Sequence, residues 1–362
     1  MDLAGLRVGL VGPLPPPAGG MANQTRQLAE LLGAAHASVF LVQSNAPYRP
    51  AWAGRVAFIR AVFRLLPYLL ALWRVAGKVQ LFHIMANSGW SWHLVAAPAI
   101  LIARVHRVPV VVNYRGGEAE QFLIRSQALV RRSMKQVAAL VVPSGFLLDV
   151  FSRFGMRASI VPNIIDLTRF CPREAGRSTA AHLVVARNLE PLYDNETALR
   201  AFQIVRRHSP HARLTIAGSG PEEARLRDLA SRLGLADGVT FSGRLDRDSM
   251  ASLYRRADIV LNPSLADNMP NSLLESMASG VPVVSTDVGG IPFIVRDGVT
   301  ALLVKPGDAE AMAAAVMTLL DDGDLWHRLS LAGIAEVERY TWPHVAPVLA
   351  DVYRSAMRPA RH

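Results

Sequence analysis

A short polar segment in the second half of the chain contains the side chains best suited to chemistry. Residues 267–271 read Asp-Asn-Met-Pro-Asn, and a helical pattern begins near Pro270 or Asn271. The first N–H groups of such a helix have no acceptor within the helix, so they can bind a phosphate group. Asp267 and Glu275 flank this helix start, and carboxylates accept hydrogen bonds from sugar hydroxyls. The alternatives are that Asp267 caps the helix and that Glu275 lies on a solvent-exposed helix face.

A pair of glycines near the N-terminus could also approach a ligand. Gly19 and Gly20 follow a proline-rich loop and precede a helical pattern over Asn23 to Leu32. A residue without a Cβ lets the backbone come close to a bound group, and the N–H groups at a helix start face an anion. The alternative is an ordinary proline-glycine turn.

Several other chemistries lack the residues that they require. No Gly-Lys-Ser/Thr phosphate loop is present, and Glu223 follows the Gly-Ser-Gly turn at 218–220 where a dinucleotide-binding fingerprint has its third glycine. No group of cysteines and histidines has zinc spacing. Asp246 and Asp248 resemble a metal-binding pair, but they open a helical pattern, so we interpret them as capping residues. The sequence therefore predicts neither a metal nor a cofactor.

These residues need a scaffold, and the apolar pattern of the chain predicts one. Twelve short apolar runs alternate with longer stretches of helical spacing, which indicates parallel sheets with helices on both faces. The alternation stops between Pro162 and Thr179 and then restarts, so the fold class is α/β with two units in tandem. The expected strands are residues 6–12, 38–42, 81–85, 108–113, 139–142 and 159–161, followed by 182–186, 213–217, 239–242, 259–262, 281–285 and 301–304.

Length and composition predict two folded domains, and the cysteine content and the N-terminal pattern predict a cytoplasmic location. A chain of 362 residues exceeds the usual size of one domain, and 51% hydrophobic against 19% charged residues excludes intrinsic disorder. The single cysteine, Cys171, cannot form an internal disulfide, and no basic and then apolar leader precedes the first strand. Both features predict a cytoplasmic protein.

Positive charge is concentrated in the first half of the chain. Residues 1–175 hold 19 basic and 7 acidic residues, whereas residues 176–362 hold 20 and 22. No acidic residue lies between Glu30 and Glu118, where nine basic residues occur. Such a surface predicts an anionic partner, namely a phospholipid leaflet, a nucleic acid or a phosphorylated substrate.

A basic amphipathic segment over residues 58–78 belongs to this half. On a helical wheel its basic residues share one side, opposite an apolar side. The apolar run Leu65 to Trp73 is nine residues long, too short to span a bilayer, so the segment either lies in the membrane interface or packs on the sheet. We favour the interface, with Pro67 as a possible kink. The basic residues are Arg60, Arg64, Arg74 and Lys78, and the apolar ones are Phe58, Val62, Leu65, Leu66, Leu69, Leu72 and Trp73.

A series of motifs covers nearly the whole chain and is densest between residues 182 and 306. It comprises Gly-Gly at 19–20, Arg187, Leu-Thr-Ile-Ala-Gly-Ser-Gly-Pro at 214–221, Phe-Ser-Gly at 241–243, Ala-Asp-Ile at 257–259, Pro-Ser at 263–264, Leu-Glu-Ser-Met-Ala-Ser-Gly-Val-Pro-Val-Val at 274–284 and Gly-Gly at 289–290. This series resembles the retaining nucleotide-sugar glycosyltransferases of family 4.

The resemblance implies the GT-B fold, in which two Rossmann-like domains with parallel sheets face each other across a cleft. It implies an acceptor-binding domain at 1–168 with a crossover helix at 343–362, and the basic amphipathic segment predicts that this domain faces the membrane. A nucleotide-sugar-binding domain would follow at 169–342.

The resemblance also implies roles for individual residues. Asp267 would contact the donor sugar, Glu275 would hold the ribose hydroxyls, and Arg187 would neutralise the diphosphate. With Arg115, which can supply further positive charge, Asp267 and Arg187 form the expected catalytic set. The expected donor-binding residues are Gly19, Gly20, Tyr193, Gly218, Arg244, Leu245, Asn268, Met269, Pro270, Asn271 and Glu275.

Three positions depart from the family pattern. Tyr193 stands near the place of a lysine that would meet diphosphate charge. Asp267 replaces a glutamate, and the resulting Asp-Asn-x-Pro-Asn motif looks like a subgroup associated with polysaccharide biosynthesis. Arg115 lies where the family often has a histidine after the fourth strand.

These features predict a hexosyltransferase that is peripheral on the inner face of the cell membrane and needs no metal. It would move a sugar from a nucleotide donor to a glycolipid or saccharide hydroxyl, with retention at the anomeric carbon. One alternative is a nucleotide-sugar epimerase of the same fold, which would need no acceptor site. Another is a non-catalytic binding protein that uses the basic half; the basic residues lack the interleaved aromatic residues that stack on nucleic acid bases, so we expect no nucleic acid partner.

Overall fold

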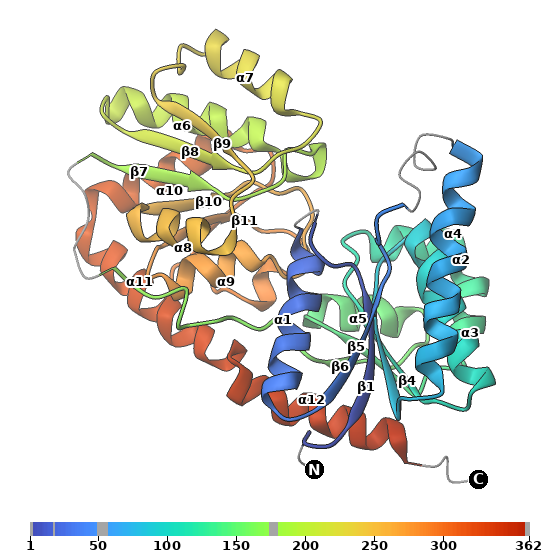
Figure 1. Ribbon diagram of the computed structural model, residues 1–362. Coiled ribbons are helices and arrows are strands. Elements are labelled where there is room, and N and C mark those ends of the chain that lie inside the picture. Colours follow the sequence, from blue (N-terminus) through green and yellow to red (C-terminus); the bar gives the residue numbers. More distant parts are fainter. Residues whose placement is uncertain (1–2, 17–18, 49–56, 174–179, 359–362) are drawn as a thin grey trace. The chain divides into compact units, whose positions relative to one another are not determined.

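The computed structural model describes residues 3–16, 19–48, 57–173 and 180–358 (Figure 1). The chain divides into unit 1, which comprises Met1–Asn163 and Trp342–His362, and unit 2, which comprises Ile164–Thr341. It crosses from one unit to the other after Asn163 and again after Thr341, where the sequence suggested 168 and 342. Each unit has its own sheet and its own core.

Unit 1 is built on a parallel six-stranded sheet with the strand order β2-β1-β3-β4-β5-β6. All six expected apolar runs form strands, and their ends differ from the prediction by at most two residues. The central strand β3 is buried at every residue, as expected for a parallel strand covered on both faces. The strands are β1 (Arg7–Gly12), β2 (Ser38–Gln43), β3 (Leu81–Ala86), β4 (Val110–Tyr114), β5 (Ala139–Val142) and β6 (Ser159–Ile160).

Helices cover both sides of this sheet (Figure 1). Helix α1 contacts β1 and β2, whereas the last helix of the chain, α12, returns to unit 1 and contacts β4 and β5. A core cluster joins strand residues such as Ile84 and Val112 to Leu72, Ile100 and Leu123 of three helices. Burying one such side chain stabilises the fold by roughly 1.5–3 kcal/mol. The helices are α1 (Gly20–Ala34), α2 (Ala57–Ala76), α3 (Ala97–Val105), α4 (Ala119–Met134), α5 (Gly145–Arg153) and α12 (Trp342–Met357).

Helix α2 is the predicted amphipathic segment, and it has two apolar faces. Leu72 is fully buried and Leu65 and Leu69 pack partly against the core of unit 1, so one face packs as an ordinary helix does. Leu66 and Trp73 remain about half exposed on another face. Lys78 was expected on this helix, but α2 ends at Ala76, so Lys78 lies beyond it. The side chains of Phe58, Arg60 and Val62 lie outside the described residues. Within the described part of the chain, no helix is both long and apolar enough to cross a bilayer.

Unit 2 repeats the plan of unit 1 with a second parallel six-stranded sheet, in the order β12-β11-β10-β7-β8-β9. Its six expected strands also form, again to within two residues at each end. The strands are β7 (His182–Val185), β8 (Arg213–Ala217), β9 (Val239–Gly243), β10 (Ile259–Asn262), β11 (Val283–Thr286) and β12 (Leu302–Val304). The helices are α6 (Asn195–His208), α7 (Glu223–Arg232), α8 (Arg247–Arg256), α9 (Asn271–Ala278), α10 (Ala309–Asp321) and α11 (Gly323–Val337).

Candidate functional site

Four loops of unit 2 carry most of the predicted donor-site residues. Arg187 follows β7, Gly218 follows β8, Arg244 follows β9 and Asp267 follows β10. Because the sheet is parallel, these loops share the edge at which the strands end. The strand order reverses direction between β10 and β7, and ligands of open α/β sheets bind at such a switch point. Arg187 and Asp267 lie on its two sides.

Arg187 and Asp267 contact each other directly. One terminal nitrogen of the Arg187 guanidinium donates to Asp267 Oδ2, and the other lies 3.4 Å from Ser272 Oγ. Only 10% of the Arg187 side chain and 14% of the Asp267 side chain are exposed, so water screens this ion pair less than a surface pair. The guanidinium also lies over the ring of Tyr193, 4.1 Å from its centroid. Tyr193, which the sequence placed near the position of a family lysine, therefore supports Arg187 and brings no charge of its own.

The Arg187 guanidinium retains one unsatisfied donor. Its Nε atom is buried and has no hydrogen-bond partner among the described residues. Leaving a buried donor unsatisfied costs roughly 1–3 kcal/mol. A ligand that offers an acceptor at this point would remove that cost, which makes the end of β7 a binding position for an anion.

Helix α9 presents its N-terminus beside Arg187, through Ser272 in its first turn. It begins at Asn271, as predicted, and its first turn has neither a side-chain cap nor an acidic residue. The positive end of the helix dipole is therefore not neutralised by a carboxylate of the helix itself. Together with Arg187, this arrangement suits a diphosphate.

Asp267 does not cap α9. Pro270 occupies the capping position, and Asp267 Oδ1 accepts a hydrogen bond from the N–H of the next residue, Asn268, at 2.8 Å. The alternative in which Asp267 is a helix cap is therefore wrong. Its carboxylate is fixed by a local turn on one oxygen and by Arg187 on the other.

Glu275 lies in the second turn of α9, and its side chain is half-buried. Its Oε2 atom lies 3.3 Å from the hydroxyl of Tyr254, a fully buried residue of α8 that donates to it. Burial raises the pKa of Glu275 to about 7, against the smaller opposing effects of Tyr254 and Arg247. The alternative of a solvent-exposed helix face is therefore wrong, and the site contains a carboxyl that titrates near neutrality.

Glycines allow these loops to pack closely. A Cβ at Gly218 would lie 1.9 Å from the carbonyl oxygen of Arg187, and a Cβ at Gly220 would lie 2.2 Å from that of Leu189. Gly289 has φ +53°, and a Cβ there would lie 2.2 Å from the carbonyl oxygen of Asp267. Backbone atoms cannot move aside as a flexible side chain can, so glycine is required at these positions. Gly218 thus positions Arg187, whether or not it also contacts the donor.

The remaining predicted residues of unit 2 differ in exposure. Arg244 is exposed, and its Nε donates to Ser219 Oγ at 2.6 Å. Leu245 packs partly against a core cluster that contains the buried side chain of Met269, so Met269 can face a ligand only through its backbone. Asp246 accepts a hydrogen bond from Ser249 N at 2.7 Å and caps α8, which confirms its interpretation as a capping residue.

In unit 1 the paired glycines open α1. Gly19 is the residue before the helix, Gly20 is its first residue, and the first turn has neither a side-chain cap nor an acidic residue. No described atom lies within 4 Å of a Cβ placed on Gly19, so packing against the described residues does not require glycine there. The free helix start agrees with a ligand-facing role.

Arg115, the third residue of the expected catalytic set, follows β4 and joins a buried polar network. Its Nε donates to Asn113 Oδ1 at 3.1 Å, and one terminal nitrogen donates to Asn163 Oδ1. The Asn113 amide nitrogen lies 3.1 Å from His83 Nε2, and His83 Nδ1 lies 2.8 Å from the hydroxyl of Tyr353 on α12. A chain of hydrogen bonds thus links Arg115 to the C-terminal helix.

The charges in this network follow from its geometry. Because Arg115 donates to the Asn113 carbonyl oxygen, the Asn113 amide nitrogen must donate to His83 Nε2, which leaves Nδ1–H to donate to Tyr353. This is a neutral imidazole, and burial, with a smaller contribution from Arg115, lowers the pKa of His83 to about 3. Burial also lowers the pKa of Arg115 to about 9. His83 is therefore a core histidine in which both ring nitrogens have a hydrogen-bond partner.

Several residues of these sites were not anticipated. Ser272 stands in the first turn of α9 and could have been found from the helix start alone. No sequence pattern around Tyr254 or Tyr353 predicts its role, because each hydrogen-bonds a residue that is distant in the sequence. Tyr254 is 21 positions from Glu275, and Tyr353 is 270 positions from His83. No group of three or more histidine, cysteine or acidic side chains in the described ranges could hold a metal ion.

Comparison with known proteins follows the same division of the chain. Residues 18–169 match the family described as Glycosyltransferase Family 4, and residues 181–322 match Glycosyl transferases group 1. A glycogen synthase of Mycobacterium tuberculosis is 30% identical over 283 residues, which cover 74% of this chain and 68% of that protein. A D-inositol 3-phosphate glycosyltransferase of Segniliparus rotundus is 30% identical over 275 residues, which cover 71% of this chain and 61% of that protein. The chain thus spans about three fifths of the length of that relative.

Solved structures share the fold. Sucrose-phosphate synthase from Thermosynechococcus elongatus matches with a TM-score of 0.78 and 20% identity, over 96% of this chain and 98% of that one. Anabaena HepE in complex with UDP-glucose matches with a TM-score of 0.75 and 17% identity, over 96% and 99%. The architecture, two parallel six-stranded sheets with helices, is therefore that of the GT-B fold.

Replacing Gly218 with alanine should displace Arg187 and destabilise unit 2, because the new methyl group would collide with a backbone carbonyl. We expect a loss of about 1–3 kcal/mol in the free energy of unfolding, measured with denaturant. Gly33→Ala is the matched control, since it adds the same methyl group to a helix where no described atom lies within 4 Å. Equal stability of the two variants would show that the close packing does not hold in solution.

Replacing Glu275 with glutamine should stabilise the protein in a pH-dependent way. The unfolded carboxyl has a pKa of about 4.3, so between that pH and 7 the folded chain binds more protons and stability falls as pH rises. The variant should exceed the parent by about 3–4 kcal/mol near pH 8 and by less than about 1 kcal/mol near pH 4.5. Denaturant unfolding at both pH values tests this, with Glu338→Gln at an exposed position as control. A difference that does not change with pH would contradict the buried carboxyl.

Proposed function

The chain belongs to glycosyltransferase family 4, and from this premise we propose that it is a retaining hexosyltransferase that uses a nucleotide-sugar donor. The proposal depends above all on one observation. At the switch point of unit 2, Arg187 pairs with Asp267 and keeps a buried donor unsatisfied, beside the uncapped start of α9. This combination offers positive charge and N–H groups to a diphosphate and a carboxylate to sugar hydroxyls.

Each part of the donor then has a residue suited to it. Arg187 and the first N–H groups of α9 bind the diphosphate and stabilise the charge that develops on it as the glycosidic bond breaks. Asp267 accepts from a hydroxyl of the transferred sugar, and Glu275 accepts from the ribose hydroxyls. Gly218 and Tyr193 hold Arg187 in place. Arg244 and Leu245 flank the base.

Retention follows from attack on the same face of the sugar as the leaving group. The acceptor oxygen forms the new bond to the anomeric carbon, the donor phosphate oxygen leaves with the electron pair, and the acceptor proton passes to that phosphate oxygen. This course needs no carboxylate as base, which agrees with the engagement of Asp267 by Arg187 and Asn268 N. Arg187 keeps the departing phosphate in the required position.

We propose that unit 1 binds the acceptor, a glycolipid or a saccharide precursor, at the inner face of the cell membrane. Relatives named for inositol phosphate and for glycogen indicate that acceptors vary within the family. The excess of basic residues in the first half of this chain favours an acceptor that carries phosphate. Gly19, Gly20 and Arg115 are the residues of unit 1 expected to face the substrates.

A donor panel tests the proposal directly. UDP-, GDP- and ADP-sugars are compared by thermal shift, with UDP-glucose first because HepE binds it, and transfer is then measured with lipid-extracted and soluble saccharide acceptors. We expect one donor to raise the melting temperature and to be consumed only when an acceptor is present. Interconversion of the sugar without an acceptor would instead indicate an epimerase, and binding of no donor would refute the proposal.

Asp267 and Glu275 should fail in different ways. Glu275→Gln should weaken donor and free nucleotide binding, because the ribose does not change during the reaction. Asp267→Asn should lower turnover without weakening nucleoside diphosphate binding, because it touches the transferred sugar and its removal frees Arg187 for phosphate. Losses of about tenfold to a hundredfold are expected for a hydrogen bond to a charged group. Calorimetric nucleotide affinity and steady-state kinetics distinguish them, and identical effects would contradict the assigned roles.

Turnover should survive chelation, because Arg187 and the α9 N–H groups already supply positive character at the diphosphate. The measurement is the initial rate with and without EDTA, after removal of free metal. A complete loss that added magnesium or manganese restores would show that a metal supplements Arg187.

A further inference from the structure

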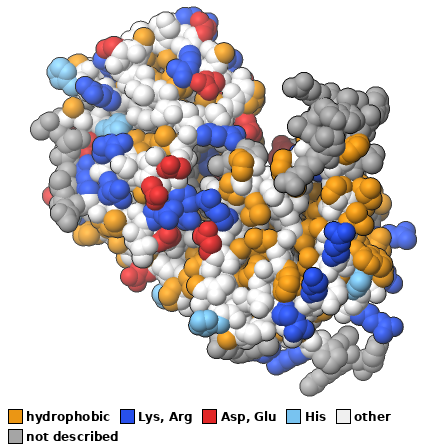
Figure 2. Space-filling view, in the orientation of Figure 1, with side chains coloured by type: hydrophobic (Ala, Val, Ile, Leu, Met, Phe, Trp, Pro, Cys, Tyr) orange, Lys and Arg blue, Asp and Glu red, His pale blue; other side chains and the backbone are white. Residues whose placement is uncertain are grey.

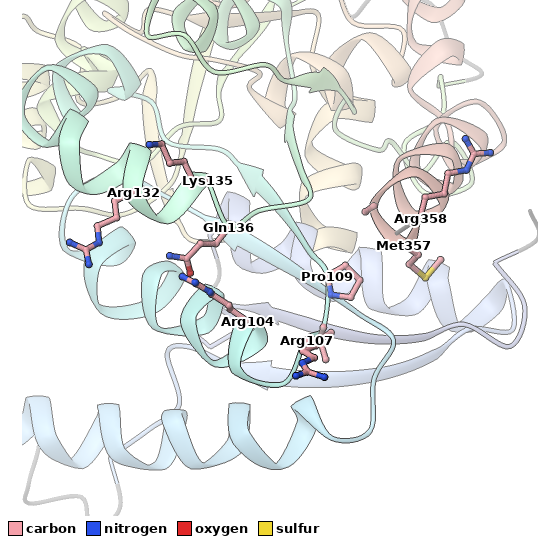
Figure 3. A pocket seen from close by; sticks show the side chains of 10 residues that line it. Arg104, Arg107, Pro109, Arg132, Lys135, Gln136, Met357 and Arg358 are labelled. Carbon is pink, nitrogen blue, oxygen red and sulfur yellow. The ribbon is translucent and has the colours of Figure 1, made fainter. Parts of the chain in front are cut away.

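A cationic pocket lies at the edge of the unit 1 sheet where the strands begin, opposite the edge that carries Gly19 and Arg115. It has a volume of about 740 Å³ and includes Val108 and Pro109, which lead into β4 (Figure 3). The ends of α3, α4 and α12 form its wall. Nothing in the proposed transfer reaction uses it.

The pocket carries much more positive charge than its helices require. Five cationic side chains line it and no acidic one does, and no carboxylate of the described residues forms an ion pair with any of the five. Cations are common at helix C-termini, but each of the three helix ends supplies only about half a negative charge. All five side chains are exposed, and a net charge of roughly +3.5 therefore remains at this surface to attract an anionic ligand. The five residues are Arg104, Arg107, Arg132, Lys135 and Arg358.

Arg107 occupies a position where the backbone favours glycine. It follows the end of α3 with φ +57°, in the left-handed region that usually terminates helices with glycine. His36 is also in this region, with φ +60°, but does not line the pocket. Arginine at position 107 is less stable in this backbone conformation than glycine would be, but it adds a guanidinium group to the pocket.

Exposed apolar side chains adjoin the pocket. Leu101 and Val105 of α3 are 56% and 60% exposed, and Val105 lies between the pocket residues Arg104 and Arg107. On the neighbouring helix α2, the 53% exposed ring of Trp73 meets the ring of His106 edge-on, with centroids 4.5 Å apart. Figure 2 shows apolar and basic side chains together over this side of unit 1. We call Leu66, Leu70, Trp73, Leu101 and Val105 the apolar patch.

We propose that the pocket binds the phosphate of an anionic membrane phospholipid while the apolar patch enters the bilayer interface. A phosphate-rich surface matches the unpaired charge, and half-exposed aliphatic and indole groups beside it match the acyl boundary. The inference deepens the proposed location at a membrane. The sequence placed the main membrane contact on the basic side of the segment over residues 58–78. The pocket places it instead where the strands of unit 1 begin, at the edge opposite the loops expected to face the substrates.

Vesicle binding by the full chain tests the charge. Arg104→Gln combined with Arg132→Gln should weaken binding to phosphatidylcholine vesicles containing phosphatidylglycerol by roughly tenfold to thirtyfold. Arg125→Gln combined with Arg157→Gln is the control, since both residues are exposed in unit 1 outside the pocket. If both double variants lost vesicle binding equally, net positive charge alone would explain the binding, and the proposed phosphate site in the pocket would be wrong.

Two further substitutions separate insertion from stability. Trp73→Ser should reduce vesicle binding, whereas Trp90→Ser, at a residue 78% exposed elsewhere in unit 1, should not. Arg107→Gly should raise the melting temperature and yet weaken vesicle binding, whereas His36→Gly should raise the melting temperature alone. The proposal would be contradicted if Trp73→Ser and Trp90→Ser changed vesicle binding equally, and if Arg107→Gly and His36→Gly did so too.

Soluble ligands distinguish the source of the phosphate. Glycerol phosphate and inorganic phosphate are titrated as competitors of the anionic vesicles, and we expect only weak competition. Saturable binding of inorganic phosphate that depends on Arg104, without vesicle binding, would overturn the lipid assignment. Donor thermal shifts are measured on the same variants. A variant that loses vesicle binding but still binds the donor supports the proposed pocket. A protein that binds vesicles but no donor contradicts the proposed function and leaves the pocket proposal standing.

Discussion

The adjacency of β7 and β10 is the constraint on which the donor site depends. The chain lays these strands side by side although some seventy residues separate them, and it builds the rest of the sheet outward in both directions. The connections that follow these two strands leave the sheet in opposite directions, and ligands of open α/β sheets bind at such a switch point. Arg187 and Asp267 stand on its two sides, and their ion pair holds both side chains.

The site keeps several features that a structure selected only for stability would lose. Arg187 Nε is buried without a described acceptor, α9 begins without a side-chain cap, and Glu275 is held where burial raises its pKa to about 7. Each is unfavourable in the free protein, and each becomes favourable when a ligand supplies an anion or hydroxyl donors. The close glycine contacts and the apolar clusters beneath the loops offset them.

Unit 1 places different chemistry at the two edges of its sheet. The edge where the strands end carries the glycine-led start of α1 and the buried chain of hydrogen bonds from Arg115 to Tyr353. The edge where they begin carries the cationic pocket and the exposed ends of α3 and α4. A parallel sheet makes this separation possible, because all strands end at one edge and all helices return to the other. A membrane contact at the second edge leaves the first free for the nucleotide-sugar donor and for the saccharide part of an acceptor.

The sequence by itself determined the twelve strands, the two α/β units, the start of α9 and the residues gathered after β7 and β10. Apolar periodicity and turn residues are local signals, so they are readable without a partner, and the family motifs added the GT-B fold. Only the tertiary structure decided what each residue touches. It rejected a cap for Asp267 and an exposed face for Glu275, and it joined His83 to Tyr353 across 270 positions. It also ended α2 before Lys78 and gathered cations from three helix ends into one pocket. These outcomes depend on which distant segments meet, and no local pattern encodes that choice.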